Sequence, residues 1–300
     1  MLSLFPYVGR FAPSPTGPLH LGSLLTALAS FLDARSCGGR WLIRIDDLDT
    51  PRVVEGAERL ILDTLASYGL VHDEPIVRQS TRSEAYGKAV WSLIAENRAF
   101  HCGCTRREAQ TGPVGDEGPI YPGTCREGLG PGRTARSVRS RVTPDPVVFM
   151  DRVQGLFEQY LVRAIGDFVI RRADGIAAYQ LATVVDDAFQ GVTDIVRGAD
   201  LLSSTPRQLR LYQDLGLAVP RSYAHIPILV DTYGEKLGKS TGALALTADD
   251  RHGDLVCCLT WLGQVPPASL ARASVGEIIA WGVAHWDPAR IPRVSTLSVD

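Results

Sequence analysis

The sequence contains no apolar run that approaches the roughly 18 residues a helix needs to span a membrane. Its N-terminus also lacks the basic stretch followed by a long apolar stretch that marks a secretory signal peptide. Both absences argue against a membrane-spanning or exported protein. We therefore expect a cytoplasmic protein with no membrane partner.

An excess of charge of either sign is missing as well. The 31 Lys and Arg residues nearly balance the 33 Asp and Glu residues, which gives a formal net charge of −2. A nucleic-acid partner must therefore be met by a local basic patch, because the surface as a whole does not attract polyanions. Six cysteines in 300 residues are too few for a disulfide framework, and three of them are clustered. This usage favours a reducing compartment with a metal site.

The chain is organised around the loop at residues 10–23, RFAPSPTGPLHLGS. A short apolar run before it predicts a buried strand, and the apolar residues 24–32 predict a buried helix. Prolines in the loop exclude regular structure, whereas Gly17 and Gly22 permit tight backbone paths. A loop that leads into a helix start presents free N–H groups and the positive end of the helix, so it predicts an anion site. By itself such a loop is more often only a strand-to-helix connection.

A second basic loop lies far along the chain, at residues 236–240, KLGKS. Its two lysines suit a flexible loop that closes on a triphosphate. Neither loop matches the usual phosphate-loop or dinucleotide-loop patterns. Together they resemble the paired signatures of class I aminoacyl-tRNA synthetases.

The order of predicted elements indicates an α/β fold with a Rossmann-like, doubly wound parallel sheet. Acidic residues at 46, 47 and 49 follow a predicted strand, where ligands bind in open α/β sheets. The predicted strands are residues 40–46, 179–187, 192–198 and 226–230, and residues 147–170 alternate as strands do. The predicted helices are residues 53–69, 83–100, 203–215, 249–262 and 274–281, with an irregular tail after 287.

The pattern breaks at His101, where an inserted module rich in Gly, Pro and Arg begins. Cys102, Cys104 and Cys125 suit Zn²⁺, which takes about four nitrogen or sulfur ligands in a tetrahedron. The fourth ligand could be His101, Tyr121 or water, and the residue types alone favour His101. The alternative is three unliganded thiols, because C-x-C with one distant Cys is a partial pattern.

Five arginines in this module have only Glu127 to oppose them, which predicts a contact with a nucleic-acid phosphate backbone or else a solvated surface. They are Arg126, Arg133, Arg136, Arg139 and Arg141.

Longer motifs within residues 10–240 resemble the catalytic core of glutamyl-tRNA synthetases. These motifs are RFAPSPTGPLHLG, RIDDLD at 44–49, YQLA at 179–182, VDD at 185–187 and VRGADLLSSTPRQ at 196–208. Only about 60 residues follow the second signature, too few for that family's tRNA-reading C-terminal domains. The short length and the Cys-x-Cys…Tyr-x-x-x-Cys cluster resemble the glutamyl-Q tRNA(Asp) synthetases.

This resemblance implies four segments. A Rossmann-like nucleotide-binding domain would occupy residues 1–100 and 179–235, interrupted by the zinc-binding module at 101–178. The KLGKS loop and a small C-terminal helical region, with no anticodon-binding domain, would occupy 236–300. Nothing in the sequence demands a dimer, and we expect a monomer.

The resemblance also implies the activity: glutamate is activated with ATP and Mg²⁺ without tRNA, then transferred to queuosine at the wobble position of tRNA(Asp). One alternative is a compact synthetase that charges a tRNA 3′ end. The other is an inactive paralogue that only binds nucleotide or RNA.

The resemblance further implies the roles of individual residues. The glutamate-binding residues would be Arg10, Phe11, Ala12, Pro13, Ser14, Asp46, Tyr179 and Arg197. The ATP-binding residues would be His20, Gly22, Ser23, Lys236 and Lys239, with His20 and Lys239 catalytic. One structural Zn²⁺ would be held by Cys102, Cys104, Tyr121 and Cys125, so Tyr121 replaces His101 in this expectation. Asp46 departs from the family's usual Glu, and Leu237 and Gly238 depart from its usual signature.

Overall fold

The computed structural model describes residues 6–237, 246 and 250–299. Lys239, predicted to be catalytic, lies outside the described residues. Among the helices that the structure describes, none is both long and apolar enough to cross a bilayer.

The N-terminal part of the described chain is a parallel β-α-β arrangement. The strands β1 (Val8–Phe11), β2 (Arg40–Ile45) and β3 (Val77–Arg78) pair in that order, with Val8 opposite Arg40. The helix α1 (Leu21–Ser36) connects β1 to β2 and packs against both. It is buried on most faces, as its apolar sequence predicts, and α2 (Ala57–Ser67) follows β2. The predicted α/β class is confirmed.

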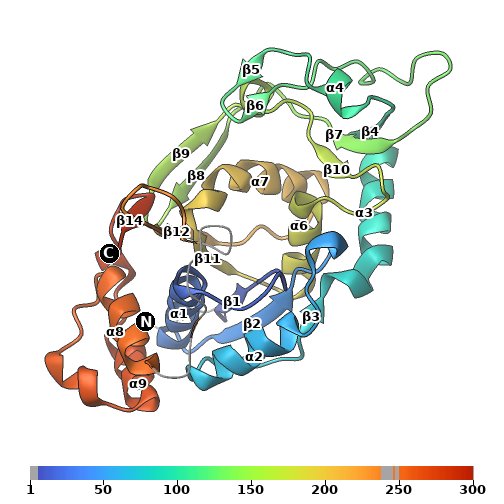
Figure 1. Ribbon diagram of the computed structural model, residues 1–300. Helices are drawn as coiled ribbons and strands as arrows, with labels where there is room; N and C mark the ends of the chain where they lie inside the picture. The colour runs from blue at the N-terminus through green and yellow to red at the C-terminus, as the bar shows by residue number, and fades with distance from the viewer. Residues whose placement is uncertain (1–5, 238–245, 247–249, 300) are drawn as a thin grey trace.

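The second half of the core returns beside β1 (Figure 1). Its elements are α6 (Tyr179–Phe189), β11 (Asp194–Gly198), α7 (Thr205–Asp214), β12 (Ser222–Ile226) and β13 (Ile228–Val230). The strands β11 and β12 are parallel, and the Thr193 amide donates to the Val8 carbonyl at 2.9 Å. This juxtaposition brings the C-terminal residues of β1 and β11 to the same region.

The prediction of a strand at residues 179–187 was wrong, because this segment is α6. The run of β-branched and apolar residues suits either state, and periodicity cannot separate a buried helix from a buried strand. Helix α6 buries Leu181, Val184 and Asp187 together, which are three residues apart. Tertiary packing between α3 and α7 decides the outcome.

The inserted region forms a separate group of strands (Figure 1). Its antiparallel sheet has the order β10 (Val169–Arg171), β7 (Ser137–Ser140), β4 (Ala99–Cys102). The helix α3 (Ser83–Ala95) ends before β4, so the helix predicted for residues 83–100 is too long. The hairpin β8 (Val147–Asp151) and β9 (Gly155–Gln159) joins the core through β12. The short elements are α4 (Arg106–Ala109), β5 (Val114–Gly115), β6 (Gly118–Pro119) and α5 (Leu161–Ala164).

The C-terminal part packs on α1. The helices α8 (Arg251–Trp261) and α9 (Val275–His285) both contact it. They lie close to the helices predicted at residues 249–262 and 274–281. The tail is not irregular throughout, because β14 (Thr296–Ser298) pairs in parallel with β13. Three residues of strand leave too short a pattern for recognition from sequence.

Candidate active site

One cavity of about 780 Å³ is lined by residues of the first predicted loop and by Lys236 and Leu237, the described residues of the second. The residues that line it from the predicted glutamate and ATP sets are Arg10, Phe11, Ala12, Pro13, Ser14, His20, Gly22, Ser23, Asp46, Tyr179, Arg197 and Lys236. A Cβ built on Gly22 would lie 3.6 Å from the Leu237 carbonyl oxygen, so the start of the second loop touches the start of α1. Of the predicted members of these two sets, only Lys239 is not placed, since it lies outside the described residues.

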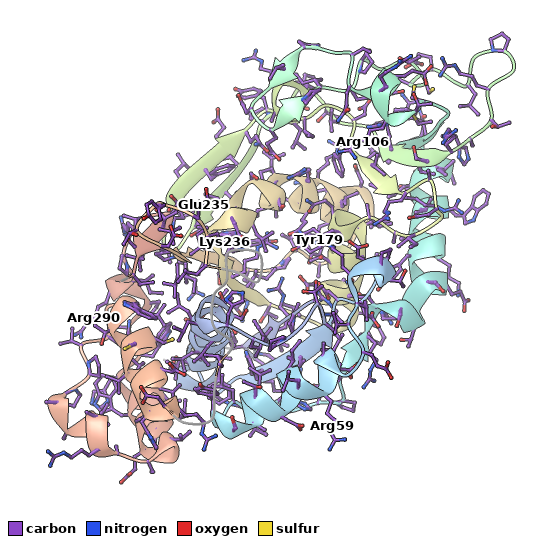
Figure 2. All side chains as sticks on the ribbon, in the orientation of Figure 1. Arg59, Arg106, Tyr179, Glu235, Lys236 and Arg290 are labelled. Atoms are coloured by element: carbon purple, nitrogen blue, oxygen red, sulfur yellow. The ribbon has the colours of Figure 1, made fainter. Side chains whose placement is uncertain are left out.

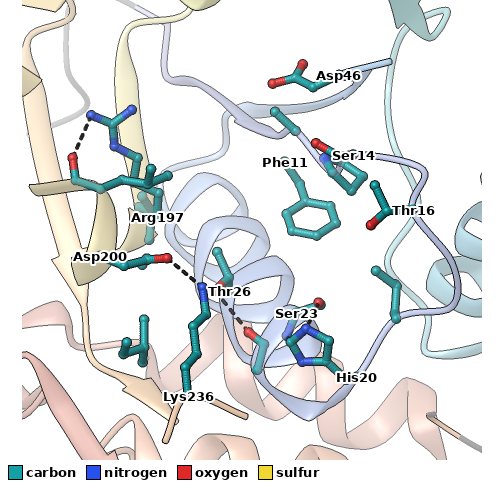
Figure 3. A pocket seen from close by; sticks show the side chains of 18 of the residues that line it. Phe11, Ser14, Thr16, His20, Ser23, Thr26, Asp46, Arg197, Asp200 and Lys236 are labelled. Carbon is teal, nitrogen blue, oxygen red and sulfur yellow. Dashed lines mark hydrogen bonds and ion pairs between the residues drawn. The ribbon is translucent and has the colours of Figure 1, made fainter. Parts of the chain in front are cut away.

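The positive end of α1 opens into this cavity (Figure 3). His20 is the N-cap of the helix, and its Nδ1 accepts a hydrogen bond from the Ser23 amide at 3.3 Å. The preceding loop is fixed to the end of β2, because the Asp46 amide donates to the Pro13 carbonyl at 3.0 Å. A helix N-terminus that faces a cavity favours bound anions such as phosphate.

The wall formed by β1 and β2 holds two buried arginines, and each has a carboxylate partner. Arg10 donates from Nε and Nη2 to the two oxygens of Asp187, both at 3.2 Å. Arg44 binds the same carboxylate and donates from Nε to Asp46 at 2.7 Å. Burial alone would raise the pKa of Asp187, but Arg10 and Arg44 hold it below its ordinary value. The positive charges of this wall are thus neutralised by the protein itself.

The opposite wall, formed by β11 and β12, holds Arg197 in a different environment. Arg197 is only 3% exposed and donates from Nε to His225 Nε2 at 3.0 Å and from Nη2 to Thr205 Oγ1 at 2.8 Å. Its Nη1 is buried without a hydrogen-bond partner, and no carboxylate of the described residues lies within ion-pair distance of its guanidinium. Buried charges in proteins are normally paired. The unpaired charge of Arg197 therefore indicates an anionic ligand in this cavity.

His225 reaches Arg197 as a neutral ring. Burial lowers the pKa of His225 to about 4, and Nδ1 lies 2.6 Å from Asp151 Oδ2. Although burial opposes it, the hydrogen bond from His225 holds the pKa of Asp151 below its ordinary value. The Nδ1–H therefore donates to the carboxylate, which leaves the Nε2 lone pair to accept from Arg197. Asp151 lies on the β8–β9 hairpin, so the inserted region helps to orient an arginine of the core.

The second signature loop begins on the same side of the cavity as Arg197 (Figure 3). Lys236 Nζ forms an ion pair with Asp200 Oδ2 at 2.5 Å. Both side chains line the cavity. Tyr179 lines it from α6 and is 40% exposed, so its hydroxyphenyl ring is accessible to a ligand.

The three predicted thiol ligands meet in the inserted region. The sulfurs of Cys102, Cys104 and Cys125 lie within 4.8 Å of one another, and the last two are 3.6 Å apart. Sulfurs on a tetrahedral zinc, each about 2.3 Å from it, are about 3.8 Å apart. The Tyr121 hydroxyl lies 3.4 Å from Cys102 Sγ and 3.7 Å from Cys104 Sγ. This donor set fits a metal ion.

His101 does not belong to this cluster of thiols among the described residues. It precedes Cys102 on β4, and successive side chains on a strand point to opposite faces. His101 instead lines a different cavity. The preference for His101 from residue types alone was wrong, because His101 lies outside the cluster; the Tyr121 hydroxyl lies beside the thiols, and its role as a ligand stays a prediction.

Most of the five arginines predicted to contact phosphate have partners within the inserted region. Arg126 pairs with Asp167, Arg133 with Glu108 and Arg141 with Glu127. Arg139 stacks over the Tyr121 ring, with its guanidinium carbon 3.9 Å from the centroid. Only Arg136 is exposed without such a contact among the residues described. These side chains stabilise an apolar-poor module, and their contact with a nucleic acid stays a prediction.

Comparison with known proteins identifies the family of this chain. Residues 7–259 match the model of the catalytic domain of class I tRNA synthetases (E and Q). The chain belongs to this family. It is 54% identical over 291 residues to a glutamyl-Q tRNA(Asp) synthetase of Pseudomonas aeruginosa, covering 97% of each chain. It is 50% identical over 286 residues to the protein of the same name from Thiobacillus denitrificans, covering 95% of each.

Two solved structures share the fold. The glutamate-tRNA synthetase of Elizabethkingia anophelis superposes with a TM-score of 0.80 at 23% identity, over 99% of this chain and 68% of the other. The glutamate tRNA ligase of Elizabethkingia meningosepticum gives 0.79 at 24%, over 97% and 66%. This chain therefore spans about two thirds of those proteins. As a member of this class I family, it is a ligase.

Sequence reasoning did not assign functions to several residues of this class I site. Arg44 and Asp187 lie within motifs that were recognised, so their residue types were visible. Asp151, Thr205 and His225 carry no local signal, because only the fold brings them within hydrogen-bond distance of Arg197.

Proposed function

We propose that this protein activates glutamate with ATP, without tRNA, and transfers the glutamyl group to queuosine at the wobble position of tRNA(Asp). The names of its 50–54% identical relatives support this acceptor. The observation that carries the first step is Arg197, a buried guanidinium with no carboxylate partner among the described residues, in the cavity shared by both signature loops.

In this proposal Arg197 binds one substrate carboxylate, because that contact neutralises its buried charge. Arginine suits this task, since its planar guanidinium can bind a carboxylate through two hydrogen bonds. Arg10 and Tyr179 bind the other carboxylate. Arg10 is already held by Asp187, so it contributes orientation more than net charge.

Asp46 is proposed to bind the substrate ammonium. Its Oδ1 accepts from Arg44, and within the described residues Oδ2 has no hydrogen-bond donor. Burial raises the pKa of Asp46, with Arg44 opposing this shift. An ammonium ion at Oδ2 would favour the ionised form further. The contact from Arg44 fixes the orientation of this carboxylate, which is one methylene shorter than the family's Glu.

The chemistry needs no protein nucleophile. A glutamate carboxylate oxygen attacks the α-phosphorus of ATP, pyrophosphate leaves, and glutamyl-adenylate remains. We propose that His20, Gly22 and Ser23 at the start of α1 bind the phosphates and that Lys236 and Lys239 neutralise charge, with Mg²⁺ arriving on ATP. Positioning and charge neutralisation provide the rate enhancement. A hydroxyl of the modified nucleoside then attacks the adenylate carbonyl, and AMP leaves.

The metal proposed for Cys102, Cys104, Tyr121 and Cys125 is structural zinc. Four protein ligands leave no open position for catalysis, and a bound metal stabilises a module with few apolar residues. We expect about one equivalent of zinc by elemental analysis. A fully folded, metal-free preparation would contradict this assignment.

The test of function has two steps. Pure protein should catalyse glutamate-dependent ATP–pyrophosphate exchange without RNA, and absence of exchange would identify an inactive paralogue. Labelled glutamate should then be transferred to tRNA from cells that make queuosine and not to tRNA from cells that cannot. Charging of an unmodified tRNA(Glu) transcript at its 3′ end would instead identify a compact glutamyl-tRNA synthetase.

A further inference from the structure

A second cavity of about 580 Å³ adjoins the active site. Asp46 lines the active-site cavity and Asp47 lines the second one; Tyr179 lines the first and Ala177 the second. The chain segments after β2 and before α6 therefore each contribute to both cavities. Tyr179 and Lys236, which line the active-site cavity, lie near the centre of the molecule (Figure 2).

One wall of the second cavity is α3, which exposes a tryptophan. The helix buries Tyr86, Val90 and Leu93 against the inserted sheet and α6. Trp91 lies beside that apolar stripe, lines the cavity and is 69% exposed. A tryptophan so exposed adds little to the core, and it presents a large aromatic surface to a ligand.

Gly87 stands one helical turn before Trp91 on the same cavity wall. A Cβ built on Gly87 meets no atom within 4 Å, and the residue does not have a positive φ. Neither packing nor backbone conformation therefore requires glycine here, although glycine weakens a helix relative to alanine. Its effect is to keep the space beside the Trp91 ring open.

The rim of the cavity carries one arginine, Arg171, whose charge is not paired with a carboxylate of the described residues. Arg171 donates only from Nε, to the Gly175 carbonyl at 3.3 Å, and among the described residues it has no carboxylate partner. Two carboxylates also line the cavity, and each has hydrogen-bond or ion-pair partners of its own. Asp47 accepts from the Ser80 amide and hydroxyl, and Asp174 pairs with Arg172 at 2.7 Å.

We propose that this cavity binds one nucleotide of the RNA substrate, adjacent to the nucleoside that enters the active site. The base stacks on Trp91, and a backbone phosphate faces Arg171. An exposed aromatic ring with a cation at the rim is the usual means of binding an unstacked base of a single-stranded loop. This inference rests on the proposed transfer to RNA, and it names the contact that places the acceptor strand.

The test compares variants at the two wall positions in two assays. Trp91→Ala removes the stacking surface, and Gly87→Leu fills the space beside it. Both should raise the KM for RNA in glutamate transfer by about tenfold, while glutamate-dependent ATP–pyrophosphate exchange stays within twofold of the wild type. Trp91→Phe should restore most of the RNA affinity, since it keeps an aromatic face.

Gly87→Ala is the matched control, because its methyl group meets nothing and leaves most of the space open. It should transfer glutamate with an unchanged KM for RNA. Wild-type KM values in both Trp91→Ala and Gly87→Leu would overturn the inference and leave the proposed function intact. A parallel loss of exchange would also overturn it, because the cavity would then serve activation. A wild-type enzyme that exchanges pyrophosphate but glutamylates no RNA would overturn the proposed function itself.

Discussion

The two walls of the active-site cavity differ in whether the protein pairs their buried arginines with carboxylates. On the β1/β2 wall, Arg10 and Arg44 share Asp187, so the protein neutralises its own charges. On the β11/β12 wall, Arg197 hydrogen-bonds, among the described residues, to neutral groups: the His225 ring, the Thr205 hydroxyl and the Leu201 carbonyl. The first arrangement builds a rigid wall before any ligand arrives. The second leaves a charge that a ligand must neutralise.

This difference separates stability from binding. A buried ion pair that loses one partner destabilises the fold, because the remaining charge is uncompensated. A buried cation without a partner already destabilises the free protein through its uncompensated charge, and binding of an anion removes this penalty. Substitutions on the first wall should therefore reduce stability, and substitutions on the second should reduce glutamate activation.

The largest expected effect is on the first wall. Asp187→Asn should lower the free energy of unfolding by about 3–5 kcal/mol, because Arg10 and Arg44 lose their shared counter-charge. Denaturant unfolding followed by circular dichroism measures this. Asp174→Asn is the control, since it removes an exposed ion pair and should cost under about 1 kcal/mol. Equal effects of the two variants would contradict the comparison.

Acid should act on the second wall through His225. Its pKa is about 4 in the folded protein and about 6.5 in the unfolded chain, so the unfolded chain binds the proton first as pH falls. Stability is therefore full above pH 6.5 and decreases by as much as about 3 kcal/mol toward pH 4. Because the pKa of Asp151 is lower in the folded protein than in the unfolded chain, protonation of Asp151 reduces stability further only below the unfolded pKa near 3.8. Unfolding titrations at several pH values should show this slope, and His225→Gln should reduce it.

Arg197→Lys should reduce kcat/KM for glutamate in pyrophosphate exchange by about 2–3 kcal/mol, roughly 30- to 150-fold. Lysine keeps the charge but cannot form two parallel hydrogen bonds to a carboxylate. Arg210→Lys, an ion pair with Asp214 outside the cavity lining, is the matched control and should exchange normally. An unchanged rate in Arg197→Lys would remove Arg197 from the glutamate site.

The smallest expected effect is that of Thr205→Val, which removes the hydroxyl that accepts from Arg197 Nη2 at 2.8 Å. We expect KM for glutamate to rise by about 1 kcal/mol, or fivefold, since valine keeps the shape but leaves one donor unsatisfied. The KM for ATP should not change. Equal increases in both constants would indicate a general distortion of the cavity.

Motifs whose residue types identify their chemistry were predictable. The first signature loop, Lys236 and Leu237 of the second, and Arg197 line one cavity, and the three thiols lie together. The helix α6 was not predictable, because an apolar run with β-branched residues suits a strand or a buried helix equally. The prediction that His101 joins the thiols was also wrong, because successive side chains along β4 point to opposite faces and His101 therefore points away from Cys102.

By itself the sequence determined the α/β class, the two motifs whose described residues line the cavity and the residue types able to bind an anionic substrate. Only the tertiary structure decided which arginine is neutralised and which is not. Charge compensation depends on the distance between groups far apart in the chain, such as Arg10 and Asp187 or Arg197 and His225. Coulomb energies and hydrogen bonds depend on that distance and on burial, and the local sequence determines neither the distance nor the burial.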